Sequence, residues 1–216
     1  MPLSWKKLLS HLWPVPVESV QGTMGELEVR WENGRKVLNS HGANQSFGSL
    51  HQVWRLTFEA IHLANDPPGN VLMLGLGGGS IPRILRDELG LCPAIVAIEQ
   101  DPVMIDLARR HFDLPPDITV LEGDALIQIH ALKERFALVC VDLFHDLNMV
   151  RGVETNGFIH ALRDRTGTNG ACCFNTVAYD QASDIRCERV LSQLKKAFSN
   201  VQELRFAEVN RVFVAS

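Results

Sequence analysis

Apolar positions from residue 51 onward follow two periods in alternation. Residues 51–64 repeat apolar side chains at helical spacing, with Val53 and Leu56 on the apolar face, whereas residues 70–79 form a continuous apolar run that ends in glycines. Further strands are expected at 94–100, 118–125, 136–144, 170–177, 201–206 and 210–216, and further helices at 80–89, 101–112, 156–166 and 188–198. Buried strands that alternate with helices predict an α/β protein with a doubly wound parallel sheet, closed by an antiparallel edge hairpin.

A short helix and a β-hairpin are predicted ahead of this sheet. The stripe from Trp5 to Trp13 has apolar residues at helical spacing, which favours docking on the domain or on a second subunit. A membrane-surface helix is the alternative, but the polar face is not richly basic. Residues 25–40 alternate around Asn33-Gly34, a strong hairpin signal. We therefore expect a helix and hairpin region over residues 1–50 and the sheet domain over residues 51–216.

Charge and cysteine content narrow the class of protein. The 216 residues carry 21 Lys and Arg against 25 Asp and Glu, a formal net charge of −4, which argues against nucleic acid or an anionic membrane as a partner. The five cysteines have no metal-ligand spacing and read as buried thiols of a reducing cytoplasm. Pro14 and Pro16 cut the first apolar stretch short of a signal sequence or a membrane span. A cytoplasmic protein that acts on a small molecule is expected.

Residues that can bind a nucleoside follow the first two predicted strands of the sheet. Gly75, Gly77 and Gly79 come directly after the first, where the backbone can turn tightly and lie against a ligand. Glu99 ends the next strand 20 residues after Gly79, where a carboxylate accepts both hydroxyls of a ribose. Turn glycines and strand-end glutamates also occur for structural reasons, but their combination in this order favours a nucleoside site.

Two aspartates follow the third and fourth strands. Asp124 can accept the exocyclic amine of an adenine while the main-chain N–H of its neighbour Ala125 donates to the ring, although a surface Asp in a turn is the alternative. Asp142 ends the fourth strand beside the expected place of the ligand's reactive end. It is a candidate general base, with a helix cap as the alternative. The pattern predicts a Rossmann-like sheet with a nucleoside at the carboxyl ends of its strands.

The motifs NGRKVLNSHGANQS, GLGGGSIPR, IEQDPVMIDLARRHF, LEGDA, FALVCVD and GACCFN together resemble the spermidine synthase (polyamine aminopropyltransferase) family. The resemblance runs from the hairpin to Asn175, and EQDPVMIDLARRHF is its fairly specific part. It implies an N-terminal β-hairpin domain and a Rossmann-like domain of the S-adenosylmethionine-methyltransferase type. It also implies a pocket for decarboxylated S-adenosylmethionine or its methylthioadenosine product, and a homodimer formed through the N-terminal end.

The resemblance also implies a role for each site residue. SHGANQ falls on the family's D-G-x-x-Q element, so Gln45 would reach toward the aminopropyl arm of the nucleoside. By the same correspondence with the family, Glu99 would bind the ribose, and Asp124 and Ala125 would bind the adenine. Asp142 would deprotonate the attacking amine. Displacement at a carbon beside a sulfonium needs a neutral amine and no metal.

The acceptor half of the family pattern is altered in this chain. The aspartate of the family's G-G-G-D-G-G loop falls on Gly78, and the second aspartate after the catalytic one falls on His145, with Asp146 one residue further. The family's tyrosine and adjacent polar residue fall on Trp54 and Arg55. We expect Trp54, Arg55 and His145 to contact the acceptor. Two lost carboxylates and a gained guanidinium predict an acceptor other than a simple diamine, neutral or carboxylate-bearing, with Arg55 as its anchor.

Two other functions fit the same residues. S-adenosylmethionine itself as donor would make the chain a methyltransferase, and the reduced set of acids also fits a nucleoside-binding homologue without catalysis. A nicotinamide-dependent oxidoreductase is disfavoured, because no substrate domain follows the sheet and EGDA has no role in nicotinamide binding. Arg55 has a structural alternative, an ion pair with Glu59 one helical turn on.

Overall fold

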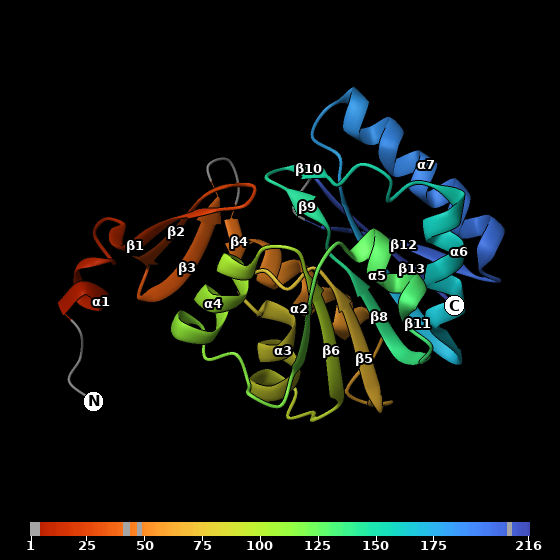
Figure 1. Ribbon diagram of the computed structural model, residues 1–216, viewed down its shortest axis with the longest axis horizontal. Coiled ribbons are helices and arrows are strands. Elements are labelled where there is room, and N and C mark those ends of the chain that lie inside the picture. The colour runs from red at the N-terminus through yellow and green to blue at the C-terminus, as the bar shows by residue number, and fades with distance from the viewer. Residues whose placement is uncertain (1–4, 41–43, 47–48, 207–208) are drawn as a thin grey trace.

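A seven-stranded sheet forms the centre of the computed structural model, which describes residues 5–40, 44–46, 49–206 and 209–216 (Figure 1). The strand order is β12-β13-β11-β8-β5-β6-β7. The strands are β5 (Asn70–Leu74), β6 (Ala94–Glu99), β7 (Thr119–Glu122), β8 (Phe136–Val141), β11 (Thr166–Val177), β12 (Val201–Phe206) and β13 (Asn210–Ala215). Strands from β11 to β7 pair in parallel, and β13 is antiparallel to both β11 and β12. The predicted α/β fold with its closing antiparallel hairpin is confirmed.

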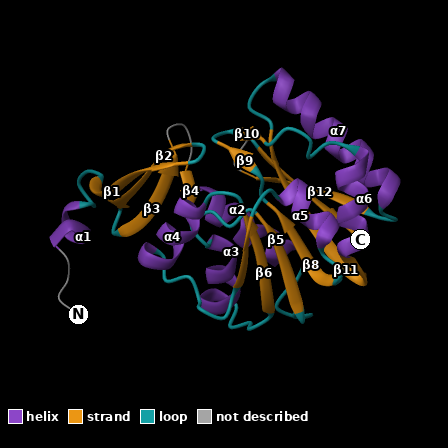
Figure 2. Cartoon of the chain, in the orientation of Figure 1, coloured by secondary structure: helices purple, strands orange, loops and turns teal. Residues whose placement is uncertain are grey.

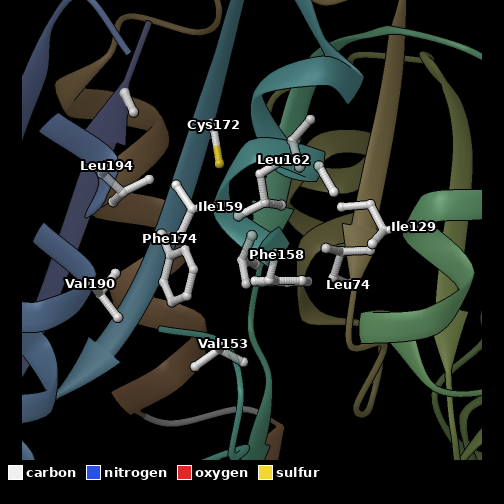
Figure 3. Close-up of a cluster of buried hydrophobic side chains, with 14 of the residues drawn as sticks. Leu74, Ile129, Val153, Phe158, Ile159, Leu162, Cys172, Phe174, Val190 and Leu194 are labelled. Carbon is white, nitrogen blue, oxygen red and sulfur yellow. The ribbon is translucent and has the colours of Figure 1, made fainter. Parts of the chain in front are cut away.

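Helices cover both faces of the sheet (Figure 2). One face is covered by α2 (Ser49–Ala60), α3 (Ser80–Arg83), the π-helix η1 (Ile84–Glu88) and α4 (Pro102–His111), and the other by α5 (Ala125–Ala131), α6 (Asn156–Arg165) and α7 (Gln181–Ala197). Because successive strand residues point to opposite faces, Leu72 and Leu74 join one core while Val71 and Met73 join the other. Figure 3 shows the first core, where Phe158 meets Phe174 edge-on.

The switch in chain direction lies between β5 and β8. From β5 the chain adds β6 and β7 on one side, and then crosses back to add β8 on the other. The loops that follow β5 and β8 therefore run to opposite faces of the sheet. Their separation opens a crevice at this point, which is where a doubly wound sheet binds its ligand.

Three segments differ from the sequence-based expectation. Helix α5 was not predicted, because only Ala125 and Ile129 of its seven residues are buried and no long apolar period marks it. The last helix begins at Gln181 rather than at residue 188, where Asp180 caps it with a capping box. After β8, two short strands, β9 (Phe144–His145) and β10 (Asn148–Met149), pair as a small hairpin.

The N-terminal region is a four-stranded antiparallel sheet. The predicted hairpin is present as β2 (Gly25–Glu32) and β3 (Arg35–Ser40), joined at Asn33 and Gly34, which have φ of 49° and 77°. The additional strands β1 (Val15–Gly22) and β4 (Asn44–Ser46) were not predicted, and β1 is interrupted by an irregular register at Pro16. The domain boundary predicted between residues 50 and 51 stays a proposal.

This N-terminal sheet packs against α4 (Figure 1). Leu27 and Val29 of β2 form a buried cluster with Met104 and Leu107 of α4. The helix α1 (Trp5–Leu9) lies at the far end of the sheet, and the predicted apolar stripe is exposed, with Trp5 at 63%. Homodimer formation through this end stays a prediction. Within the described ranges, no helix has both the length and the apolar character needed to cross a membrane.

Glu18 of β1 ties the N-terminal sheet to the end of α4. Arg110 donates to both carboxylate oxygens of Glu18, at 2.7 and 3.0 Å, and His111 Nε2 lies 2.6 Å from Oε2. These contacts, with Arg110 as the larger cause, lower the pKa of Glu18 from 4.5 to about 2. A bidentate guanidinium pair across two elements fixes their relative orientation as well as their charge balance.

We predict that Glu18→Gln lowers the free energy of unfolding at pH 7 by about 1 kcal/mol, because the partly exposed charge pair is lost. The folded-state pKa lies below the unfolded value of 4.5, so this contribution is complete above pH 4.5 and disappears as the pH falls toward 2. Urea unfolding at pH 7, 5 and 3.5 measures it. The control Glu59→Gln removes a looser, exposed pair with Arg55 at 3.7 Å and should change little. A pH-independent loss in Glu18→Gln would contradict the assignment.

Candidate functional site

A cavity of about 250 Å³ lies at the carboxyl ends of β5, β6 and β8. Its walls include the loops after these strands, the start of α5 and residues of β2 from the N-terminal sheet. Both parts of the chain therefore shape one space at the switch point of the sheet.

The glycine loop after β5 forms one wall of the cavity. Gly75 has φ of 91°, and a Cβ at this position would lie 2.2 Å from the carbonyl oxygen of Asp142. Only glycine fits, since both the positive φ and the contact exclude a side chain. Gly77 also lines the cavity, whereas Gly79 is the residue before α3, with φ of 75°, and is not among the described lining residues.

Glu99 joins this loop to the next strand. Its Oε2 accepts the main-chain N–H of Leu76 at 3.0 Å and of Gly77 at 3.4 Å, and its Oε1 accepts that of Asp101 at 3.1 Å. The structure thus brings together the glycine loop and Glu99, which the sequence spacing predicted to form one site. A carboxylate has about four acceptor sites, so Glu99 retains capacity for ligand hydroxyls.

Asp124 lies in the cavity wall at the start of α5. Its Oδ1 accepts the N–H of Leu126 at 2.8 Å, so it caps the helix, and Ala125 lines the cavity beside it. The helix-capping bond explains the local fold and leaves the second carboxylate oxygen for other contacts.

Asp142 is held by two side-chain donors. Trp54 Nε1 donates to Oδ2 at 2.9 Å and Asn175 Nδ2 donates to Oδ1 at 3.0 Å. Asn210 Nδ2 in turn donates to Asn175 Oδ1 at 3.3 Å. Burial raises the pKa of the Asp142 carboxyl, and the charge of Glu99 raises it further, whereas the two donated hydrogen bonds offset part of the rise.

The loop after Asp142 makes two contacts with the N-terminal sheet. His145 Nε2 lies 2.7 Å from the main-chain oxygen of Met24, in the turn between β1 and β2. Ser40 Oγ, at the end of β3, donates to Asp146 Oδ1 at 2.6 Å. Both His145 and Asp146 line the cavity, so the loop forms part of its wall next to the N-terminal sheet.

The predicted acceptor residues Trp54 and Arg55 occupy different environments. Trp54 is fully buried and reaches the site through Asp142, outside the described cavity lining. Arg55 is also outside that lining, is 44% exposed and pairs with Glu59 at 3.7 Å. Arg55 therefore gives no support to a carboxylate-bearing acceptor anchored in the cavity. The main chain of Gln45 lies in β4, but its side chain is outside the described structure, so its predicted role stays a prediction.

Asn175 and Asn210 were missed from the sequence. Asn175 follows the same strand-end pattern as Asp142, because β11 is parallel to β8 and ends at the same edge. Asn210 begins β13, which runs antiparallel, and it pairs with Val177 at the end of β11. A local motif does not mark Asn210, since only the sheet register brings it to the carboxyl edge.

Acidic side chains dominate the charge of the cavity. The carboxylates among its described lining residues are Glu26, Glu99, Asp101, Asp124, Asp142 and Asp146. The described lining contains no Lys or Arg, and neither do sequence positions 41–48 and 207–208. Such a space favours a cationic ligand. Across the described residues, no group of three or more His, Cys, Asp or Glu side chains is arranged to hold a metal ion.

We predict that Asn175→Ala raises the pKa of Asp142 further, because it removes a donor that stabilises the ionised carboxylate. Carboxyl carbon-13 NMR titration measures this directly. Asn148→Ala is the matched control, because Asn148 is exposed and bonds to Tyr179 rather than to Asp142. An unchanged Asp142 titration in Asn175→Ala would contradict the hydrogen-bonding role.

Curated proteins with similar sequences fall into two groups. No protein-family model matches the chain. A polyamine aminopropyltransferase of Chromobacterium violaceum is 29% identical over 133 residues, which are 60% of this chain and 51% of that protein. An eEF1A lysine and N-terminal methyltransferase of Danio rerio is 39% identical over 70 residues, 32% of this chain and 10% of that protein. The match thus spans only about half the length of the aminopropyltransferase.

Solved structures show the same two groups at the level of the fold. A spermidine synthase in complex with the transition-state analogue AdoDATO superposes with a TM-score of 0.73 at 16% identity, over 94% of this chain and 72% of that one. Human methyltransferase-like protein 13 in complex with SAH gives a TM-score of 0.63 at 22% identity, over 79% and 82%. In sequence the chain is similar to polyamine aminopropyltransferases over part of its length, and in fold it is similar to spermidine synthases and to a methyltransferase-like protein.

Proposed function

We propose that this chain transfers the aminopropyl group of decarboxylated S-adenosylmethionine to an amine acceptor. The observation that carries the proposal is the cavity with carboxylates and no Lys or Arg among its described lining residues. Its place at the switch point, the glycine loop and the similarity to aminopropyltransferases add independent support.

The nucleoside half of the donor fits the loops after β5, β6 and β7. In this proposal Gly75 and Gly77 let the backbone approach the ligand, Glu99 accepts the ribose hydroxyls, and Asp124 with Ala125 binds the adenine. Gln45 would extend from β4 toward the aminopropyl arm. The complex of a similar fold with AdoDATO, and that of another with SAH, support an adenosyl-type ligand for this chain.

Charge favours the decarboxylated donor. Decarboxylated S-adenosylmethionine carries a sulfonium and an ammonium, whereas S-adenosylmethionine adds a carboxylate. That carboxylate would enter a space lined by acids, and each unfavourable like-charge contact costs on the order of 1 to 4 kcal/mol near a protein surface. The cavity thus supports aminopropyl transfer over methyl transfer.

Asp142 is the proposed base. An amine attacks the carbon beside the sulfonium only after it loses a proton, so that a C–N bond forms while the C–S bond breaks and its electron pair stays on sulfur. The products are the alkylated amine and neutral methylthioadenosine. A pKa raised by burial gives the Asp142 carboxylate a stronger proton affinity than an exposed Asp has. Trp54 and Asn175 fix its orientation.

The acceptor is proposed to be a cationic amine. The expectation of a neutral or carboxylate-bearing acceptor rested on Arg55 and on lost carboxylates. Arg55 lies outside the described lining, and Asp146 and Glu26 add acidic groups to it. These observations weaken the charge argument against a diamine, which then rests on the carboxylate lost at Gly78.

Methyl transfer is the second candidate, because one curated relative is a methyltransferase with 39% identity over its matched segment. Calorimetric titration with each donor separates the two. We predict that decarboxylated S-adenosylmethionine binds at least about tenfold more tightly than S-adenosylmethionine, a difference of about 1.4 kcal/mol. Preference for S-adenosylmethionine would support methyl transfer. Failure of both to bind would remove both candidates and leave a homologue without this chemistry.

We also predict that Asp142→Asn lowers turnover of the accepted amine by about 10²- to 10⁴-fold, the range of general base catalysis. The dissociation constant of methylthioadenosine should change less than about twofold, because the product carries no proton for Asp142 to accept. Asp164→Asn, at an exposed position of α6, is the matched control. Turnover of Asp142→Asn at the wild-type rate would exclude Asp142 as the base.

A further inference from the structure

Two buried amides connect Asp142 to the first residue of β13. Asn175 Nδ2 donates to Asp142 Oδ1 at 3.0 Å, and Asn210 Nδ2 donates to Asn175 Oδ1 at 3.3 Å. Asn175 is 1% exposed and Asn210 is 9% exposed. Asn175 pairs with Val212 across β11 and β13, and Asn210 lies two residues before Val212, so both amides point to the same face of the sheet. The sheet register therefore places one amide directly behind the other.

An asparagine amide has two ends with opposite hydrogen-bonding properties. Its NH₂ group donates and its oxygen accepts, and rotation about the last side-chain bond exchanges the two. An ionised carboxylate accepts only, so it requires the NH₂ end, whereas a protonated carboxyl has an O–H group that an amide oxygen can accept. With no second contact, Asn175 could turn as Asp142 gains or loses a proton and could stabilise either form.

We propose that Asn210 is a positioning residue for Asp142. By donating to Asn175 Oδ1, it fixes the orientation of the Asn175 amide, so that this amide offers Asp142 a donor at every stage of the reaction. The inference rests on the proposed role of Asp142 as the base, and it adds the group that controls the charge state of that base.

The fixed orientation acts on the proton that Asp142 carries. In the proposed transfer, Asp142 takes a proton from the amine and releases it before the next turnover. Because Asn210 occupies the oxygen of Asn175, the protonated carboxyl gains no acceptor from that amide, and loss of the proton is favoured. Trp54 needs no such partner, because its indole N–H can only donate. Asn175 is the partner of Asp142 whose orientation has to be fixed.

A neutral substitution at residue 210 isolates this effect from the charges around it. Glu99 is the charged group that raises the pKa of Asp142, and burial keeps the Cys140 thiol neutral by raising its pKa. Other titratable or charged residues line the cavity or a second hollow that Asn210 also lines: Glu26, Asp101, Asp124, His145, Asp146, Tyr179, Asp180, Asp184, Arg205 and Arg211. Asn210→Leu leaves all of these groups in place, so a change in the pKa of Asp142 reports the hydrogen bonds between the amides.

The direct test is carboxyl carbon-13 NMR titration of Asp142 in Asn210→Leu, which has a similar size and no hydrogen-bonding group. We predict that the pKa of Asp142 rises by at least about 0.5, an increase of about threefold in proton affinity, because the Asn175 oxygen can then turn to the protonated carboxyl. In the Asn175→Ala background the same substitution should change this pKa no further, because no amide is left to orient.

Two further variants distinguish orientation from a loss of packing. Asn200→Leu is the matched control, because Asn200 is exposed at the opposite end of β13, where its main chain bonds to Ser216, and it should leave the titration of Asp142 unchanged. Asn210→Val repeats the test with a side chain that suits a strand. An unchanged titration of Asp142 in both variants of residue 210, or an equal rise with and without Asn175, would overturn the role of Asn210.

Turnover separates this inference from the function on which it rests. If Asp142 is the base, the acid limb of the pH dependence of kcat/KM moves to higher pH in Asn210→Leu together with the pKa of Asp142. A raised pKa of Asp142 without product from decarboxylated S-adenosylmethionine in the wild type would retain the orienting role and remove the proposed transfer. Product formation with an unmoved acid limb and an unmoved titration would retain the transfer and remove the role of Asn210.

Discussion

Close contact between two strand ends organises the candidate site. Gly75 after β5 and Asp142 after β8 approach so closely that a Cβ on residue 75 would lie 2.2 Å from a main-chain oxygen. Asp142 N–H donates to the carbonyl of Leu74 at 2.9 Å, which continues the parallel pairing to the last residue of the strand. The glycine loop and the proposed base are therefore neighbours because of sheet pairing, before any side-chain contact is considered. Their common position depends on the absence of a side chain at residue 75.

Sequence patterns located the parts of the site that strand ends determine. Gly75, Glu99 and Asp142 follow apolar runs directly, and parallel pairing brings such positions to one edge of the sheet. Two side chains that hold Asp142, Trp54 directly and Asn210 through Asn175, could not be found in this way. Trp54 comes from a helix, and Asn210 comes from the start of a strand that runs the other way, so their proximity depends on packing and register.

Helix α2 illustrates how packing decides which side chains of a helix approach the cavity. The expected apolar face used Val53 and Leu56, whereas the buried side chains include Val53, Trp54 and Phe58. Rotation of the helix by about one residue places Trp54 inside, against Asp142, and directs Arg55 to solvent. A motif comparison gives the position of a residue along the helix, but the packing of that helix determines whether its side chain reaches the cavity.

The acidic cavity is completed by segments that are distant in sequence. Thr23 N–H donates to Asp101 Oδ2 at 2.9 Å, His145 contacts Met24, and Ser40 contacts Asp146. Each contact joins the N-terminal sheet to a loop at the carboxyl edge of the central sheet. Since these bonds position carboxylates as well as backbone, the N-terminal sheet contributes to the electrostatics of the cavity and not only to its shape. Separation of the two sheets would expose the acids to water, where their attraction for a cation is much weaker. The proposed selectivity for a cationic ligand would thus depend on the joined structure and could not be assigned to the central sheet alone.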